Sequence, residues 1–395
     1  MLRKTVRTYH HAYRGLSRET WLLSFIMLIN RSGTMVVPFM TLYLTRPEMG
    51  YTVGEAGIVF GFFGAGAFSG AWLGGKMTDR IGFYPVQLIT LTGGGILFFL
   101  LGQMKAYPLI CLFTFLLSFV NEAFRPANST AIAFYSREEN RTRSYAVNRL
   151  AINIGWAVGS ALGGYLAGIN YELLFWVDGF TNLGAALLLW ILLRPASFQP
   201  ANQKQNAIVT KPAYRDKDYM FFVAATVLFA TCFFQLFTNL PVFFRKDLQL
   251  TEPVIGIIMA ANGILIALFE MVIVYKLEGK RKNQFYFSIG VVLTGISFLV
   301  LNFPDAGVIT CLVMILVVTI GEILALPFMN SYWISRTQAG NRGQYAAIYT
   351  MAWSVAQTLG PVGGAQVAQH WGFTTLWWMV GGLCLLSALA FRKCA

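Results

Sequence analysis

Long apolar runs, separated by short charged or turn-rich loops, extend along almost the whole chain. Most of these runs reach the ~20 residues that an α-helix needs to cross the hydrocarbon core of a bilayer. The pattern predicts an all-α integral membrane protein with about twelve transmembrane helices. Their expected ranges are 20–44, 53–76, 83–104, 108–135, 142–168 and 171–193, followed by 219–244, 252–276, 284–302, 305–335, 343–370 and 372–391.

The two halves of the chain are related in sequence. Glu122 and Pro126 have counterparts in Glu322 and Pro327, and an even number of helices separates equivalent elements, so both halves run in the same direction. Parallel repeats of this kind are one architecture of membrane transporters, with the substrate site between the repeats near the middle of the membrane. We therefore predict a cytoplasmic N-terminal arm (1–19), two pseudo-symmetric six-helix bundles (20–193 and 219–391), a cytoplasmic linker between them (194–218) and a cytoplasmic tail (392–395).

The composition agrees with this class of protein. The chain is 56% hydrophobic and only 12% charged, which disfavours a soluble globular protein. The net charge of +13 comes from basic residues dispersed over short loops, so we expect no nucleic-acid partner. The five cysteines show no CxxC spacing, and neither HExxH nor GxSxG occurs, so we predict no metal site, disulfide framework or enzyme activity.

The basic residues also orient the predicted helices. They gather in the N-terminal arm, the central linker and alternate loops, whereas the opposite loops carry only Arg46, Lys105 and the Arg245–Lys246 pair. The positive-inside rule then places both termini in the cytoplasm. No cleavage site of small residues follows the first apolar run, so we expect this helix to be retained in a multi-pass protein of the plasma (inner) membrane.

Charged residues inside apolar segments are the candidate site residues, namely Arg31, Glu122, Arg125, Arg149 and Glu322. A charge in hydrocarbon costs about 2.5 to 3.5 kcal/mol on insertion scales, so each should face a partner or a water-filled cavity. Glu122 and Arg125 are three residues apart and share one helix face, which leaves two interpretations. They form either a structural ion pair, or a site where Glu122 binds a proton or a cationic substrate while Arg125 favours its charged form.

Glu322 has no basic residue within a helical turn, so its carboxylate needs a partner from another helix or becomes neutral. A carboxyl group that changes its charge near neutral pH is what a proton-coupled carrier requires. The alternative is a hydrogen-bonded clamp between helices. Arg31, near the middle of the first helix, could bind a carboxylate or phosphate of a substrate, or pair with Glu122 or Glu322.

The remaining intramembrane charges have weaker functional signals. Arg149 lies about two turns from a helix end, where snorkelling to the interface is the alternative to function. Glu270 is also near a helix end, and Asp178 is expected on a peripheral helix. We therefore do not prefer either acid as a coupling residue.

The segment 74–86, GGKMTDRIGFYPV, carries a family resemblance. It resembles the loop G-x-L-a-D-R-x-G-R-[KR] between the second and third helices of the major facilitator superfamily, although Phe83 and Tyr84 replace the usual basic pair. The matching residues are Gly75, Asp79, Arg80 and Gly82. The resemblance implies a twelve-helix transporter that works by alternating access. It also implies that Asp79 and Arg80 form a charge-relay latch that stabilises the outward-facing state and does not bind substrate.

The subfamily is indicated by further motifs. Gly155, Gly159, Gly163 and Gly164 resemble the GxxxGPxxGG motif of drug/proton antiporters, with Ser160 in place of the proline. The segments 124–130 and 152–155 instead resemble proton-coupled oligopeptide transporters, whose ExxER motif is absent from the first helix. On helices that line the cavity in this superfamily, we expect apolar contacts to the substrate from Tyr43, Phe124, Phe237, Tyr332 and Trp353, with lipid-facing or packed positions as the alternative.

We therefore expect a monomeric, proton-coupled transporter that exports small amphipathic or drug-like compounds and uses no cofactor besides the proton gradient. The acids and arginines would also suit a zwitterion, so a peptide or peptide-like substrate is the alternative. A further alternative is a receptor or scaffold that keeps the fold without transport. Charged residues inside the membrane that serve no function would only destabilise such a protein, which argues against this last possibility.

Overall fold

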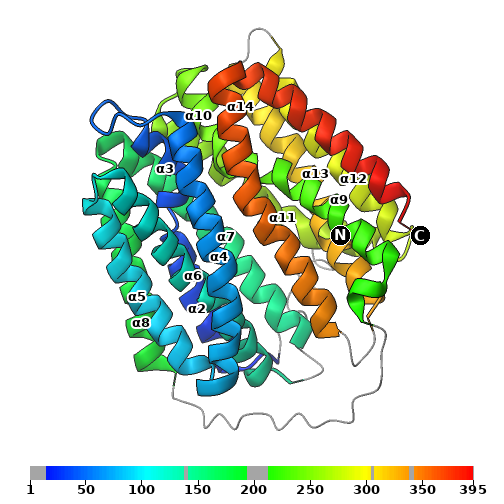
Figure 1. The fold of residues 1–395 in the computed structure, drawn as a ribbon. Helices are drawn as coiled ribbons and strands as arrows, with labels where there is room; N and C mark the ends of the chain where they lie inside the picture. Colours follow the sequence, from blue (N-terminus) through cyan, green and yellow to red (C-terminus); the bar gives the residue numbers. More distant parts are fainter. Residues whose placement is uncertain (1–14, 138–140, 194–211, 304–306, 338–341, 395) are drawn as a thin grey trace, which may run out of the picture.

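The computed structural model describes residues 15–137, 141–193, 212–303, 307–337 and 342–394. The regular elements in these ranges are helices, which Figure 1 shows as long, tilted rods packed side by side. Most of the predicted N-terminal arm and of the predicted linker, with many of the basic residues used to orient the chain, lies outside the described residues. The predicted cytoplasmic position of the termini therefore stays a prediction.

The first half of the chain contains α2 (Arg18–Ser32), α3 (Val36–Leu44), α4 (Val53–Ile81), α5 (Phe83–Gln103), α6 (Tyr107–Tyr135), α7 (Arg141–Ile169) and α8 (Glu172–Leu192). The second half contains α9 (Lys217–Phe233), α10 (Asn239–Lys246), α11 (Glu252–Leu277), α12 (Asn283–Leu299), α13 (Val308–Ser335) and α14 (Arg342–Arg392). Short 3-10 helices are η2 (Ala213–Arg215), η3 (Phe234–Phe237) and η4 (Val300–Asn302).

The number of membrane spans agrees with the prediction. Among the described residues, 11 helical segments are long and apolar enough to cross a membrane. The last of them, Tyr345–Arg392, is 48 residues long. It is interrupted at Gly372, whose φ of 82° lies in the left-handed region that favours glycine. This segment therefore makes two spans, and ten plus two gives the predicted twelve.

Two predicted helices are interrupted, which corrects the sequence prediction. The range 20–44 is divided into α2 and α3 by a break at Gly33–Met35. The range 219–244 is divided into α9, η3 and α10. Pro38 and Pro241 lie in the first turns of α3 and α10, where the missing N–H of proline is tolerated. The same helix of each repeat is thus broken at an equivalent place.

Two helix pairs provide most of the packing between the halves. In Figure 1, α4 lies beside the orange part of α14, and α7 packs on α11. Glycines allow these backbones to approach closely: a Cβ added to Gly256 would lie 2.8 Å from Cα of Gly164, and one added to Gly263 would lie 2.9 Å from the backbone oxygen of Asn153. Gly57 of α4 meets Ala365 of α14 in the same way. Most of these contacts lie toward the membrane side opposite to that predicted for the termini.

Candidate functional site

Asp178 of α8 caps the helix that begins after the break in the first transmembrane segment. The backbone N–H of Met35 donates to its Oδ1 (3.0 Å), and the backbone N–H of Val36 donates to its Oδ2 (2.9 Å). These N–H groups begin α3, where the helix itself offers them no acceptor, and a negative charge is favourable at a helix N-terminus. The side chain of Asp178 is 0% exposed. The sequence analysis placed this acid on a peripheral helix, whereas the structure makes it the cap of a broken helix.

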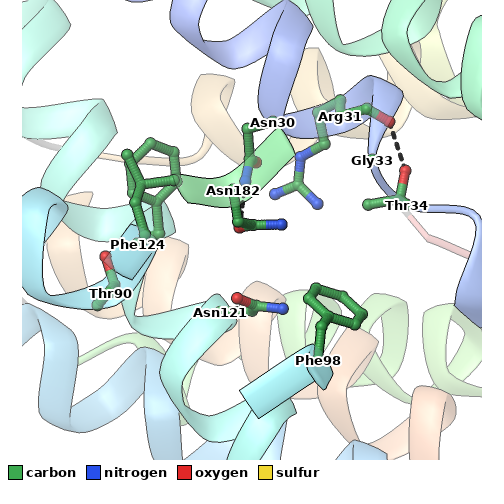
Figure 2. Close-up of a pocket in the computed structure, with 10 residues that line it drawn as sticks. Asn30, Arg31, Gly33, Thr34, Thr90, Phe98, Asn121, Phe124 and Asn182 are labelled. Carbon is green, nitrogen blue, oxygen red and sulfur yellow. Dashed lines mark hydrogen bonds between the residues drawn. The ribbon is translucent and has the colours of Figure 1, made fainter. Parts of the chain in front are cut away.

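Arg31, at the end of α2, borders a small polar cavity inside the first half (Figure 2). The cavity has a volume of about 20 Å³ and lies between α2, α5, α6 and α8. Asn30 donates to Asn182 Oδ1 (2.9 Å), and Asn182 donates to the backbone oxygen of Asp178 (2.8 Å). Nε of Arg31 is buried and has no hydrogen-bond partner among the described residues. Arg31 therefore makes neither of its predicted ion pairs in this conformation.

Glu122 and Arg125 of α6 form the ion pair that was one of the two interpretations. Nε of Arg125 lies 2.9 Å from Oε2 of Glu122. The Glu122 side chain is 10% exposed and that of Arg125 is 60% exposed. In this conformation the acid is therefore neutralised within its own helix, as the spacing of three residues allows.

Arg149 of α7 reaches across the interface between the halves. Its Nη2 lies 3.0 Å from each carboxylate oxygen of Glu270 on α11. The Glu270 side chain is 11% exposed and that of Arg149 is 39% exposed. Of the two interpretations of Arg149, snorkelling does not describe this conformation, because a carboxylate of the other half is within reach. The sequence could not supply this partner, since the two residues are 121 positions apart.

Glu322 of α13 has a partner from another helix, as predicted, but the partner is an amide. Nδ2 of Asn262 donates to Glu322 Oε2 (3.3 Å) and to Oγ1 of Thr319 (3.0 Å). The side chain makes no ion pair with a described residue. Glu270 and Arg149 lie close enough for their charges to act on Glu322. These residues thus form an electrostatic group across α7, α11 and α13.

The predicted cavity aromatics divide into different environments. Phe237 packs edge-on against Trp156 of the first half, with ring centroids 5.1 Å apart. Trp353 joins the same group through Phe233, at 5.8 Å. Phe124 is buried and lines the polar cavity near Arg31 (Figure 2).

Tyr43 and Tyr332 are packed core residues in this conformation, each 3% exposed. The ring of Tyr43 packs edge-on against Phe175, with centroids 5.0 Å apart, and Arg46 lies 4.5 Å above it. The ring of Tyr332 packs on Phe222 at 4.7 Å. In this conformation the alternative of packed rings describes them, and their contact with a substrate stays a prediction.

The family motif lies in the last turns of α4 and at its junction with α5: Gly75, Asp79 and Arg80 belong to α4, and Gly82 separates the two helices. Gly82 has φ 88°, so a residue with a side chain would be strained there. A Cβ at Gly75 would meet open space, and packing does not explain this glycine. Asp79 and Arg80 are exposed, and neither makes a side-chain hydrogen bond or ion pair with a described residue. Their role as a latch stays a prediction.

A cluster that the sequence analysis did not identify joins the start of α9 to the end of α13. Nε and Nη2 of Arg336 donate to the two carboxylate oxygens of Asp216 (2.9 and 2.8 Å), and the hydroxyl of Tyr345 donates to Oδ2 (2.9 Å). Burial opposes ionisation of Asp216, but these hydrogen bonds and one from the backbone of Tyr219 lower its pKa below the ordinary value. Hydrogen bonding to Asp216 likewise raises the pKa of Arg336. Arg336 was counted only among the basic residues that orient the helices, and Asp216 lies in the predicted linker 194–218.

Twelve apolar spans in related halves, with helix breaks and charges inside the membrane, define a membrane transporter of the secondary type. The family model of the Major Facilitator Superfamily matches residues 20–361, so the chain belongs to this family. The resemblance noted in the loop 74–86 is thereby confirmed, and with it the fold class.

Comparison with individual proteins supports the same assignment. The chain is 24% identical to a Na(+), Li(+), K(+)/H(+) antiporter of Planococcus maritimus, over 92% of each chain. It is 23% identical to the class D tetracycline resistance protein of Salmonella ordonez, over 81% of this chain and 82% of that protein. The crystal structure of a POT family transporter in complex with 5-aminolevulinic acid superposes with a TM-score of 0.80 at 15% identity, covering 95% and 96% of the two chains. The last comparison describes the fold alone.

Proposed function

We propose that this transporter exports small amphipathic compounds in exchange for protons, and that Glu322 carries the proton. The observation behind this proposal is the partner of each intramembrane glutamate. Glu122 and Glu270 each form an ion pair with an arginine, whereas Glu322 accepts from the neutral amide of Asn262.

This difference decides which acid can change its charge at low cost. Protonation of Glu122 or Glu270 would leave an arginine without its counter-charge inside the membrane, which is unfavourable. Protonation of Glu322 leaves no cation without a counter-charge, because its partner is the amide of Asn262, which can donate to a carbonyl oxygen as well as to a carboxylate. Glu322 is therefore the acid best suited to bind and release a proton.

The position of Glu322 connects its charge to the interface between the halves. When it is ionised, its negative charge acts on the Arg149–Glu270 pair, in which Arg149 comes from the first half and Glu270 from the second. When it is protonated, the Arg149–Glu270 ion pair is undisturbed and favours contact between α7 and α11. A proton at Glu322 thus biases the contact between α7 and α11. This contact between the halves is the one that must change in alternating access.

Aromatic rings near this interface suit the proposed class of substrate. Phe237 and Trp156 come from different halves and touch each other, and Trp353 lies in the same group. Such rings offer broad apolar contact and can hold a cation over their faces. Sequence similarity to an ion/proton antiporter and to a tetracycline resistance protein also favours exchange and drug export.

A second candidate function is uptake of a zwitterion such as a peptide. Arg31 in the first half and Glu322 in the second are opposite charges, and neither makes an ion pair with a described residue. A substrate with both a carboxylate and an ammonium group would complement the two. This function requires Arg31 to meet the substrate, whereas proton-coupled export requires only Glu322.

A flux experiment separates these functions. The purified protein is reconstituted in liposomes that contain a pH-sensitive dye, a proton gradient is imposed, and lipophilic cations or dipeptides are added. We expect lipophilic cations to dissipate the gradient, Glu322→Gln to abolish this flux, and Glu48→Gln, the same change at an exposed loop residue, to leave it unchanged. Proton flux with dipeptides alone would establish the second function, and unchanged coupling in Glu322→Gln would exclude Glu322 as the proton carrier.

A further inference from the structure

We propose that the polar cavity beside Arg31 is a binding site for a small monovalent inorganic anion of halide size. The site is separate from the proposed proton carrier and does not depend on proton coupling. Arg31 and Asn121 are its main ligands, with Asn182 as a third donor (Figure 2).

The first argument is charge. Nε of Arg31 is buried without a partner among the described residues, and no carboxylate lies within ion-pair distance of the guanidinium there. The charge of Glu122 acts on Arg31, but its carboxylate is 2.9 Å from Nε of Arg125, whose own positive charge also acts on Arg31. Asp178 is engaged by the backbone of α3. The guanidinium of Arg31 is thus left without an ion-pair partner of its own among the described residues, and a bound anion would supply one inside the membrane.

The second argument is the direction of the donors. Figure 2 shows the guanidinium of Arg31 and the amide nitrogens of Asn121 and Asn182 toward the same space. Asn121 makes no side-chain hydrogen bond with a described residue. Asn182 uses one amide hydrogen for the backbone oxygen of Asp178 and keeps the second, because each primary amide has two. Donors from α2, α6 and α8 therefore converge on one point, which is the requirement for binding an anion.

The third argument is size. A volume of about 20 Å³ is on the scale of one water molecule, so among anions only a monatomic ion such as a halide comes near this size. A peptide or a drug-sized compound does not fit. The cavity also lies within the first half, between α2, α5, α6 and α8, and none of its lining residues comes from the second half. A free anion is therefore favoured over the carboxylate of a transported substrate.

Bromide provides a direct test, because it can be located by anomalous scattering. Crystals of the full chain grown in sodium bromide should show an anomalous peak between Arg31 and Asn121. In thermal unfolding at constant ionic strength, with gluconate replaced by bromide, the unfolding temperature should rise with the logarithm of bromide concentration above the dissociation constant. Arg31→Gln should weaken the apparent affinity at least about tenfold, since it removes a charge-assisted hydrogen bond.

Control variants make the outcome specific. Arg46→Gln removes an arginine that is paired with glutamates near the membrane surface and should keep the full bromide response. Asn121→Leu fills the cavity without removing a charge and should abolish the response, which also tests the site if Arg31→Gln does not fold. A response to acetate without one to bromide would overturn the proposal in favour of a substrate carboxylate. Equal unfolding temperatures in bromide and gluconate, with no anomalous peak, would overturn it in favour of water.

Discussion

Replacement of Asp178 tests whether one carboxylate holds the broken first helix in place. In Asp178→Ala the backbone N–H groups of Met35 and Val36 lose their acceptor in a site that is 0% exposed. A buried donor left unpaired costs about 1–3 kcal/mol, so loss of both contacts should cost about 2–6 kcal/mol. Asp178→Asn retains one carbonyl oxygen and should cost about half as much.

Hydrogen exchange measured by mass spectrometry reports this loss locally. Peptides that cover residues 33–40 should be protected in the wild type, and local opening should become easier in Asp178→Ala. At about 1.4 kcal/mol per tenfold, a loss of 3 kcal/mol corresponds to exchange faster by about two orders of magnitude. Thermal unfolding of the same variants gives the effect on the whole protein.

The control for this experiment is Glu172→Ala, which removes an exposed acid from the start of the same helix. It should leave exchange at residues 33–40 unchanged. If Asp178→Ala also exchanged there at the wild-type rate, the carboxylate would not be the cap of α3, and the reasoning from its hydrogen bonds would be refuted.

Other predictions concern the ion pairs. Arg149→Gln and Glu270→Gln should each lower the free energy of unfolding by about 1–2 kcal/mol, less than for a fully buried pair because Arg149 is partly exposed. The double variant should lose less than the sum of the two single losses. Additive losses in thermal unfolding would contradict the ion pair between the halves. For Asp216 the native pKa is lowered, so its contribution to stability is present above the ordinary pKa of about 4 and is lost as pH falls through the native value. Asp216→Asn should therefore lower stability at neutral pH and reduce the loss of stability on acidification below about pH 4. An unchanged pH profile of the unfolding temperature would exclude this role.

The length of the apolar runs and the repeat predicted the twelve spans, because hydropathy and helix length are local properties of the sequence. The breaks in the first helix of each repeat were not predicted, since Gly33–Met35 interrupts a run that stays apolar. The role of Asp178 was missed for a different reason. Its partners are more than 140 residues away in the chain, and only the packing of α8 on α2 brings them together.

The repeat also explains why the equivalent acids of the halves differ. Glu122 and Glu322 occupy matching positions, but the residue three positions later is Arg125 in the first half and Ala325 in the second. Within α6 the arginine neutralises the acid, whereas in α13 the acid turns to Asn262 of the neighbouring helix. The difference at this one position accounts for the ion pair in the first half and for its absence in the second. This asymmetry supports assigning proton exchange to the second half and anion binding to the first.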